Sequence, residues 1–128
     1  HVGPDKSDPY TIIGVSRDPV FGAVVMVGLG GVFVEIMKDV TFRKAPFDIV
    51  EAHMMIEELQ GSAVLDGVRG APASDRDALA QALSKLSIFA AAERDHIDSI
   101  DINPFVVLPK GQGAVALDAL IVKPSPSS

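Results

Sequence analysis

Residues 10–35 read YTIIGVSRDPVFGAVVMVGLGGVFVE and hold two apolar runs separated by a turn. The turn lies at residues 17–22, where a proline fixes φ and a glycine is free to take a positive φ. The runs on either side, residues 10–15 and 23–27, are short and rich in β-branched residues, as buried strands are. We therefore predict that the chain begins its fold with a β-hairpin.

Strands and helices both follow this hairpin. Asp48 with Glu51 three residues later predicts the start of a helix, which Gly61 ends. Ser74 is expected to be the N-cap of a longer helix that ends near Glu93. This order predicts an α+β fold, in which an antiparallel or mixed sheet has its helices packed on one face. The other expected elements are strands at residues 32–34, 40–44, 99–108 and 114–123, and a short helical turn at residues 62–66.

Composition limits what the chain can do. Its 128 residues are enough for one domain or one lobe of a larger domain. The net charge of −6 argues against binding to nucleic acid, which would repel it. There is no cysteine, which excludes disulfides and fits a cytoplasmic location. The longest apolar runs, of about ten residues, are too short to cross a membrane, and no signal-peptide pattern opens the chain.

The two ends of the chain are expected to lie outside its folded part. Residues 1–9 are polar and contain two prolines, so they are interpreted as a loose arm. Residues 124–128 are rich in Ser and Pro and are predicted to be disordered. The first residue is His1 rather than Met, which we expect of a chain that has been cut or processed. Residues 10–123 would then form the folded lobe.

Three motifs resemble the ATP-grasp region of NDP-forming acyl-CoA synthetases, which is related to the β subunit of succinyl-CoA synthetase. The first motif is the hairpin stretch itself, through Glu35. The second is KDVTFRKAP at residues 38–46, and the third is DINP at 101–104 with LDA at 117–119. The resemblance covers residues 10–122. It departs from the family at Tyr10, because the family usually has Glu at that place. The departure is either a real substitution of that carboxylate or a misalignment near the end of the chain.

The resemblance implies a reaction class and an incomplete site. Such enzymes interconvert acyl-CoA, NDP and phosphate with free acid, CoA and NTP, through an acyl phosphate and a phosphohistidine. Their ATP-grasp domain holds ATP/ADP or GTP/GDP with Mg²⁺ between two lobes. This chain resembles only the distal lobe, so its expected partners are the upstream lobe and the CoA-binding domains. We expect the isolated chain to be inactive and to self-associate through apolar surface at residues 24–33.

A magnesium site is predicted on the last two strands. Asp101 and Asn103 share one face of a strand because alternate side chains do. Oxygen ligands at this spacing suit Mg²⁺, and Asp118 on the next strand is expected to supply a third. Taken without the resemblance, the same residues are ordinary solvated polar side chains at a sheet edge. The site requires Asn103 opposite Asp118, which also places Val107 opposite Ala114. Pairing of Leu108 with Ala114 would instead turn Asp118 away from Asn103, unless a bulge intervened.

The nucleotide phosphates are expected to meet residues of the hairpin stretch. Gly28, Gly30 and Gly31 form a glycine-rich stretch, although the spacing fits neither common phosphate-loop pattern. Arg17 would face phosphate oxygens, which its guanidinium matches in shape, and Glu35 would contact substrate. The alternatives are a tight turn for the glycines, a surface salt bridge for Arg17 and a solvated surface carboxylate for Glu35. For Arg43 the salt bridge is the favoured interpretation.

Two other functions stay open at this point. The chain could be a noncatalytic ATP-grasp-like module that assembles or regulates an attached domain. It could also be a lobe of a different ATP-grasp ligase. The acid, the acyl-CoA and the choice between ATP and GTP cannot be inferred from these motifs.

Overall fold

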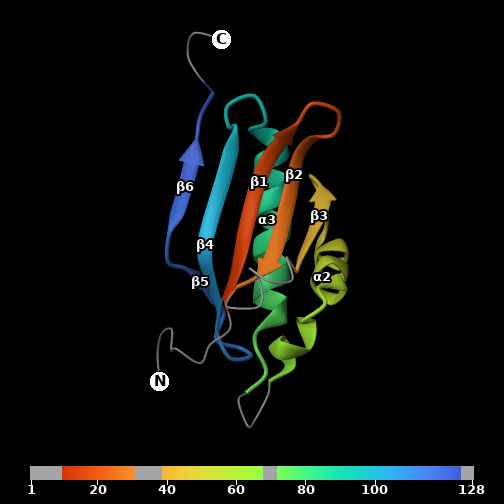
Figure 1. The fold of residues 1–128 in the computed structure, drawn as a ribbon, viewed down its shortest axis with the longest axis vertical. Helices are drawn as coiled ribbons and strands as arrows, with labels where there is room; N and C mark the ends of the chain where they lie inside the picture. The colour runs from red at the N-terminus through yellow and green to blue at the C-terminus, as the bar shows by residue number, and fades with distance from the viewer. Residues whose placement is uncertain (1–9, 31–38, 68–71, 125–128) are drawn as a thin grey trace.

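A six-stranded antiparallel sheet forms the body of the molecule in the computed structural model, which describes residues 10–30, 39–67 and 72–124 (Figure 1). The strand order is β3-β2-β1-β4-β5, and β6 also pairs with β4. The predicted α+β class is therefore confirmed. The elements are β1 (Tyr10–Asp18), β2 (Gly22–Leu29), β3 (Val40–Lys44), α2 (Ile49–Glu58), the 3₁₀ helix η1 (Ser62–Asp66), α3 (Arg76–Ala92), β4 (Ser99–Val107), β5 (Ala114–Ala116) and β6 (Ala119–Val122).

The predicted hairpin is confirmed as β1 and β2, which pair without a register shift from Thr11↔Leu29 to Asp18↔Gly22. Its turn is held by the Asp18 carboxylate, which accepts backbone N–H groups from Val20 at 2.8 Å and Phe21 at 2.9 Å. The amides of Phe21 and Val20 hold the pKa of Asp18 below its ordinary value. Gly22 follows with φ +79°, which a residue with a Cβ rarely adopts.

The two faces of the sheet differ in what covers them. Side chains that point toward the helices, such as Ile13, Val25 and Val27, are buried with those of α2 and α3 in one hydrophobic core. Figure 1 shows α3 running behind β1 and β2, with α2 beside it. No helix of the described residues covers the other face, which we call the open face. Strand side chains that alternate with the buried ones point to this face and remain accessible.

Asp39 joins the beginning of β3 to the end of the α2 region. One carboxylate oxygen accepts the N–H of Gln60 at 2.6 Å, and the other accepts the N–H of Gly61 at 2.7 Å. The backbone carbonyl of Asp39 also accepts the N–H of Leu29 at 3.2 Å. Asp39 is buried, with 7% of its surface exposed. One acidic residue thus fastens β2, β3 and the turn after α2 to one another.

Several predicted boundaries are wrong in detail. The N-cap of α3 is Asp75, whose side chain accepts the N–H of Ala78, whereas the Ser74 N–H is bonded to the carbonyl of Leu65. The first helix ends at Glu58 rather than at Gly61. The single strand expected at residues 114–123 is divided into β5 and β6. The strand predicted at 32–34, the arm at 1–9 and residues 125–128 of the tail lie outside the described residues.

None of the helices in the described residues combines the length and apolar character that a membrane span requires.

Candidate functional site: the open face of the sheet

The last strands adopt the register that the predicted magnesium site requires. Val107 pairs with Ala114, and β6 continues along β4 in the same register. Between β5 and β6, the backbone N–H of Asn103 donates to the carbonyl of Asp118 at 3.1 Å. Asn103 and Asp118 are therefore directly opposed, and directly opposed residues of an antiparallel pair share a face. This register prediction is confirmed.

The loop between β4 and β5 sets this register. It closes with a hydrogen bond of 3.0 Å from the N–H of Leu108 to the carbonyl of Gly113. Gly111 and Gly113 both have positive φ, near +87° and +89°, which favours glycine. Their N–H groups donate to one carboxylate oxygen of Asp75 at 3.1 and 2.8 Å. The residue that begins α3 thus also fixes the hairpin that aligns Asn103 with Asp118.

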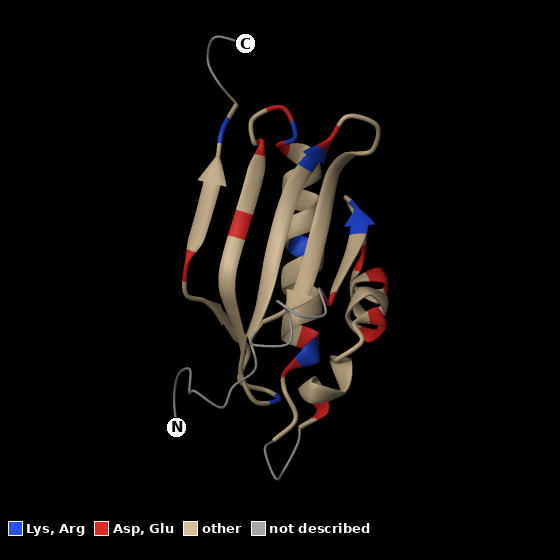
Figure 2. Ribbon diagram, in the orientation of Figure 1, with Lys and Arg blue, Asp and Glu red and all other residues tan. Residues whose placement is uncertain are grey.

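Asp101 lies on the same face as these two residues. Its neighbour Ile100 is buried in the core, so Asp101 points to the open side of the sheet. It pairs with Gly14 of β1 on one side and Leu120 of β6 on the other. Asp101, the only acidic residue of β4, interrupts an otherwise uncharged strand in Figure 2. Asp101, Asn103 and Asp118 are all exposed, so solvent and ligands can reach them.

Gly14 leaves space beside Asp101 that the sequence did not indicate. A Cβ placed there would lie 3.5 Å from Met26 Cε and 3.7 Å from the carbonyl oxygen of Ile100, which is ordinary contact. Crowding therefore does not require glycine here. Because Gly14 has no side chain, nothing projects from the middle of the open face at this position. The available signal was a glycine inside a β-branched strand, which often marks the close approach of a ligand.

The side chains of Asp101, Asn103 and Asp118 are of the chemical type that binds a hard cation, but three ligands do not complete the coordination of such an ion. Two carboxylates and one carboxamide offer the oxygen ligands that Mg²⁺ prefers, and Mg²⁺ commonly takes its remaining ligands from phosphates and water. Within the described ranges, no group of three or more His, Cys, Asp or Glu side chains is placed to hold a metal ion. The three residues would therefore contribute part of a site that a nucleotide finishes.

The structure describes two of the predicted phosphate-loop glycines, Gly28 and Gly30. Gly28 is buried in β2, and a Cβ there would lie 2.8 Å from Val40 Cγ1. Gly30 is half-buried and follows β2. Its N–H donates to the carbonyl of Tyr10 at 2.8 Å. A Cβ at Gly30 would lie only 1.9 Å from the Tyr10 ring, so no other residue fits there unless Tyr10 moves. This contact explains Gly30 as a place of tight packing. Gly31 and Glu35 lie outside the described residues, and their predicted roles are untested.

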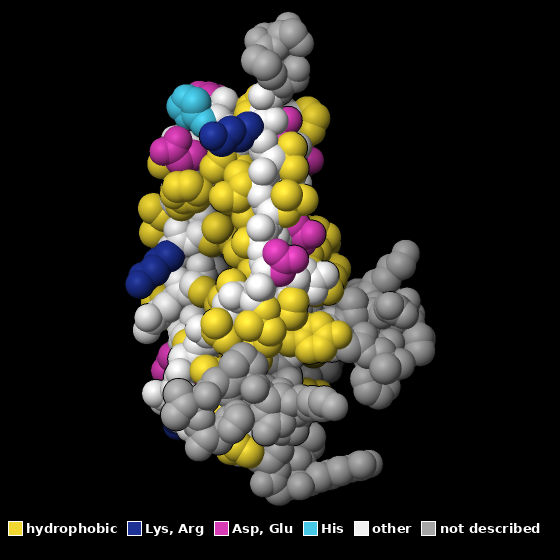
Figure 3. Space-filling view, turned by 90° about the vertical axis from the view of Figure 1, so that its left-hand side faces the viewer, with side chains coloured by type: hydrophobic (Ala, Val, Ile, Leu, Met, Phe, Trp, Pro, Cys, Tyr) yellow, Lys and Arg dark blue, Asp and Glu magenta, His cyan; other side chains and the backbone are white. Residues whose placement is uncertain are grey.

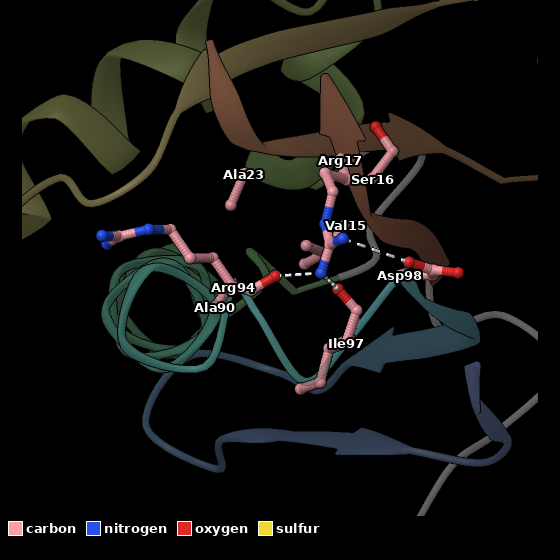
Figure 4. Close-up of a pocket in the computed structure, with 8 residues that line it drawn as sticks. All are labelled: Val15, Ser16, Arg17, Ala23, Ala90, Arg94, Ile97 and Asp98. Atoms are coloured by element: carbon pink, nitrogen blue, oxygen red, sulfur yellow. Dashed lines mark hydrogen bonds and ion pairs between the residues drawn. The ribbon is translucent and has the colours of Figure 1, made fainter. Parts of the chain in front are cut away.

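Arg17 is placed on the other side of the sheet from the three metal candidates. It follows the buried Val15 by two residues and so points toward the helices. Its guanidinium donates to the carbonyls of Arg94 and Ile97, the latter at 3.2 Å, and lies 3.6 Å from a carboxylate oxygen of Asp98 (Figure 4). These contacts fit the salt-bridge interpretation, and Arg17 is not brought together with Asp101, Asn103 or Asp118.

Replacing Arg17 by Met separates the two interpretations. The change removes the guanidinium from the carbonyls that follow α3, so the free energy of unfolding is expected to fall by about 1–2 kcal/mol. The affinity for Mg-ADP is expected to stay unchanged. Urea denaturation and a nucleotide titration measure the two quantities. Lys85→Met, which removes a cation without a hydrogen bond or ion pair to a described residue, is the control. Reduced Mg-ADP affinity with unchanged stability would contradict the structural role.

Arg43 forms the salt bridges that the sequence favoured. Its Nε donates to a carboxylate oxygen of Glu51 at 2.8 Å, and Nη2 donates to Glu58. Glu58 and then Glu51 raise the pKa of the guanidinium above its already high value. Arg43 therefore fastens β3 to α2 and contributes nothing to the open face.

A family model described as an ATP-grasp domain matches residues 6–122. The chain belongs to the ATP-grasp family. Curated relatives include the β subunit of ADP-forming acetate–CoA ligase II of Pyrococcus furiosus, which is 46% identical over 117 residues. The alignment covers 91% of this chain and 50% of that relative. ADP-forming acetate–CoA ligase of Methanocaldococcus jannaschii is 45% identical over 93% of this chain and 17% of its own length. The chain thus spans half, or less, of these relatives.

Two solved structures share the fold closely. PH1788 of Pyrococcus horikoshii superimposes with a TM-score of 0.86 at 41% identity, over 94% of this chain and 51% of that one. Acetyl-coenzyme A synthetase 1 of Candidatus Korarchaeum cryptofilum has a TM-score of 0.85 at 39% identity, over 95% of this chain and 55% of that one. The latter structure is a complex with coenzyme A and Mg-AMPPCP.

Proposed function

We propose that this chain is the distal lobe of the ATP-grasp domain of an NDP-forming acyl-CoA synthetase. The enzyme would convert acyl-CoA, NDP and phosphate to free acid, CoA and NTP, and the reverse. The observation that supports this most directly is the opposition of Asn103 and Asp118 on the open face, in a chain of this family. Relatives with the same fold are named as acid–CoA ligases that form ADP.

In this proposal the open face holds the nucleotide and its magnesium ion. Asn103 and Asp118 would bind Mg²⁺ directly or through its waters, and Asp101 would lie near enough to take part. When bound, Mg²⁺ supplies positive charge that neutralises the phosphates. The chain's own contribution is to fix these oxygen donors on a rigid sheet, beside the low surface at Gly14. ATP/ADP and GTP/GDP both remain compatible with this donor set.

The remaining ligands of the nucleotide would come from other parts of the enzyme. The expected partners are the upstream ATP-grasp lobe and the CoA-binding domains, in the same protein or the same complex. Two relatives are themselves named as β subunits, so division of this enzyme among chains occurs in the family. A cytoplasmic location is part of the same proposal. The apolar surface expected to mediate self-association at residues 24–33 is not found at residues 24–30, which are buried or half-buried, and residues 31–33 lie outside the described residues.

A noncatalytic module is the second candidate, and Tyr10 favours it. The enzymes that this chain resembles usually have Glu at this position. Here the position holds an aromatic ring, which packs against Gly30. A carboxylate that family members use would then be missing. Turnover by the complete protein distinguishes the candidates, because a noncatalytic module gives none even with every domain present.

Nucleotide binding by the chain alone tests the proposed site. One lobe offers only part of the phosphate cage, so Mg-ADP is expected to bind with a Kd on the order of 1 mM or weaker. In a ¹⁵N NMR titration the largest shifts should occur at Gly14, Asp101 and Leu120. A coupled assay with acetyl-CoA, ADP and phosphate should show no ATP formation, because positioning for phosphoryl transfer needs both lobes.

Three results would contradict this proposal. Shifts confined to the helix side would show that the open face is not the site. Micromolar affinity for Mg-ADP would mean that the lobe holds a complete site. ATP formation by the chain alone would show that it is not a fragment of the catalytic unit.

A further inference from the structure

A recessed surface lies at the hairpin end of the molecule, away from Asp101, Asn103 and Asp118. It is a hollow of about 340 Å³ between the β1–β2 turn, the end of β3 and the end of α3. Its lining includes the small side chains of Ala23, Ala45 and Ala91, with Pro46 beside them. Hollows of this size with apolar floors are common binding sites in proteins.

The hairpin turn adds two large apolar side chains to this hollow. Val20 is 81% exposed and Phe21 is 57% exposed, and both line it. The Asp18 carboxylate holds the N–H groups of both residues, so the turn has a fixed shape. Exposed aromatic residues on a preorganised turn are typical of protein interfaces, because little conformational freedom is lost when a partner binds.

The charged residues of the hollow all have the same sign. Lys44 and Arg94 are its only charged lining residues, and no acidic residue is among them. Neither cation forms an ion pair with another described residue, although Arg94 Nη1 donates to the carbonyl of Ala91 at 3.3 Å. The two lining cations contrast with the net charge of −6 of the whole chain. The nearby Asp18 carboxylate is not a lining residue and accepts the backbone N–H groups of Val20 and Phe21. The hollow is therefore suited to an anionic partner that the rest of the molecule would repel.

We propose that this hollow, lined by Val20, Phe21, Lys44 and Arg94, docks an acidic peptide segment of a partner protein. The segment would place an apolar side chain on the alanine floor and against Phe21, with carboxylates on either side facing Lys44 and Arg94. A small anion would meet the cations but leave both Val20 and Phe21 in water. The apolar wall and the two cations together therefore favour a peptide that carries both an apolar side chain and carboxylates.

This inference does not depend on the nucleotide site. Asn103 of β4 lies near the beginning of β1, with Asp118 on the other side of β4, whereas the hollow lies at the turn that ends β1. Either proposal can fail while the other holds.

Binding of designed peptides to the whole chain tests the docking site. The probes are GEELFEEG, its basic counterpart GKKLFKKG and its polar counterpart GEESSEEG, each acetylated and amidated. In ¹⁵N NMR titrations GEELFEEG should shift the amides of Gly22, Ala23, Ala45 and Ala91. The two counterparts should bind at least about tenfold more weakly, because each lacks one of the two features.

Variants then assign the effect to individual residues. Lys44→Glu and Arg94→Glu should each weaken GEELFEEG binding by about tenfold through like-charge repulsion. Phe21→Ser, at an exposed position, should weaken it similarly without loss of folding. Lys110→Glu, in the β4–β5 loop at the far end of the molecule, is the matched control and should leave binding unchanged.

Three outcomes would overturn the proposal. Equal binding of GKKLFKKG would show that charge is not recognised. Unchanged binding by both glutamate variants would place the peptide elsewhere. Equally large shifts of the same amides with sodium phosphate or acetate alone, at the same concentration, would make the hollow a site for small anions rather than for a peptide.

Discussion

Replacing Asp118 by Asn is expected to lower Mg²⁺-dependent turnover of the complete enzyme by about a hundredfold or more. The substitution keeps the size of the side chain but removes the negative charge that a divalent cation prefers. Folding should be almost unaffected, because Asp118 is exposed and its hydrogen bond with Asn103 uses only the backbone carbonyl. A loss of activity without loss of stability would separate a metal ligand from a structural residue.

The chain alone gives a direct measurement of the same effect. Mn²⁺, a paramagnetic substitute for Mg²⁺, should broaden the amide signals of Asp101, Asn103 and Asp118 first in an NMR titration. Asp118→Asn should weaken this broadening by at least about tenfold. Asp95→Asn is the matched control, since Asp95 is exposed and has no hydrogen bond or ion pair within the described residues. Equal broadening in both variants would rule out Asp118 as a ligand.

Removing the Asp39 carboxylate is expected to have the largest effect on stability. Asp39→Ala deletes both acceptors for Gln60 and Gly61, and it does so at a site that water barely reaches. Hydrogen bonds to a charged group contribute about 1.5–3 kcal/mol each, and the two amides here share one side chain. We therefore expect the free energy of unfolding to fall by about 3 kcal/mol, measured by urea denaturation.

Two comparisons sharpen this measurement. Glu57→Ala removes an exposed carboxylate of α2 that has no hydrogen bond to a described residue, and its effect should stay within about 0.5 kcal/mol. Asp39→Asn keeps one acceptor oxygen and should fall between the two. If Asp39→Ala were no more destabilising than Glu57→Ala, the two carboxylate hydrogen bonds would not contribute to stability.

The local elements of this fold could be predicted from the sequence because their signals are local. Asp18 through Gly22 contains the residues that a tight turn needs, and the turn forms where expected. Asp48 was expected to cap a helix, and it accepts the N–H of Glu51 at 2.9 Å. In a capping box the Glu51 side chain would in turn accept the backbone N–H of Asp48. Here it accepts a hydrogen bond from Arg43 of β3 instead. That choice depends on tertiary packing, which the pattern does not contain.

The site was predictable to the extent that it depends on strand alternation. Asp101 and Asn103 share a face by their spacing alone. The register of Asp118 was inferred from what a shared metal requires, since the loop sequence does not itself choose between Val107 and Leu108 as the partner of Ala114, and the structure has Val107. The position of Arg17 did not follow, because its distance from the metal candidates is set by which face the helices cover. The role of Asp75 was also hidden, since its two partners Gly111 and Gly113 lie far from it in the chain.

The sheet order has a consequence for how the chain is synthesised. The middle strand β1 is synthesised before its partner β4, and the residues that pair, such as Ser16 and Ser99, are far apart in the chain. Until residues 99–107 leave the ribosome, the backbone N–H and C=O groups along one edge of β1 have no partner strand. Such edges invite pairing with other chains. Closing this pair is a long-range event and is expected to limit the rate of folding. A protein interrupted before β4 should therefore aggregate, whereas one that lacks only β5 and β6 keeps its central strand enclosed.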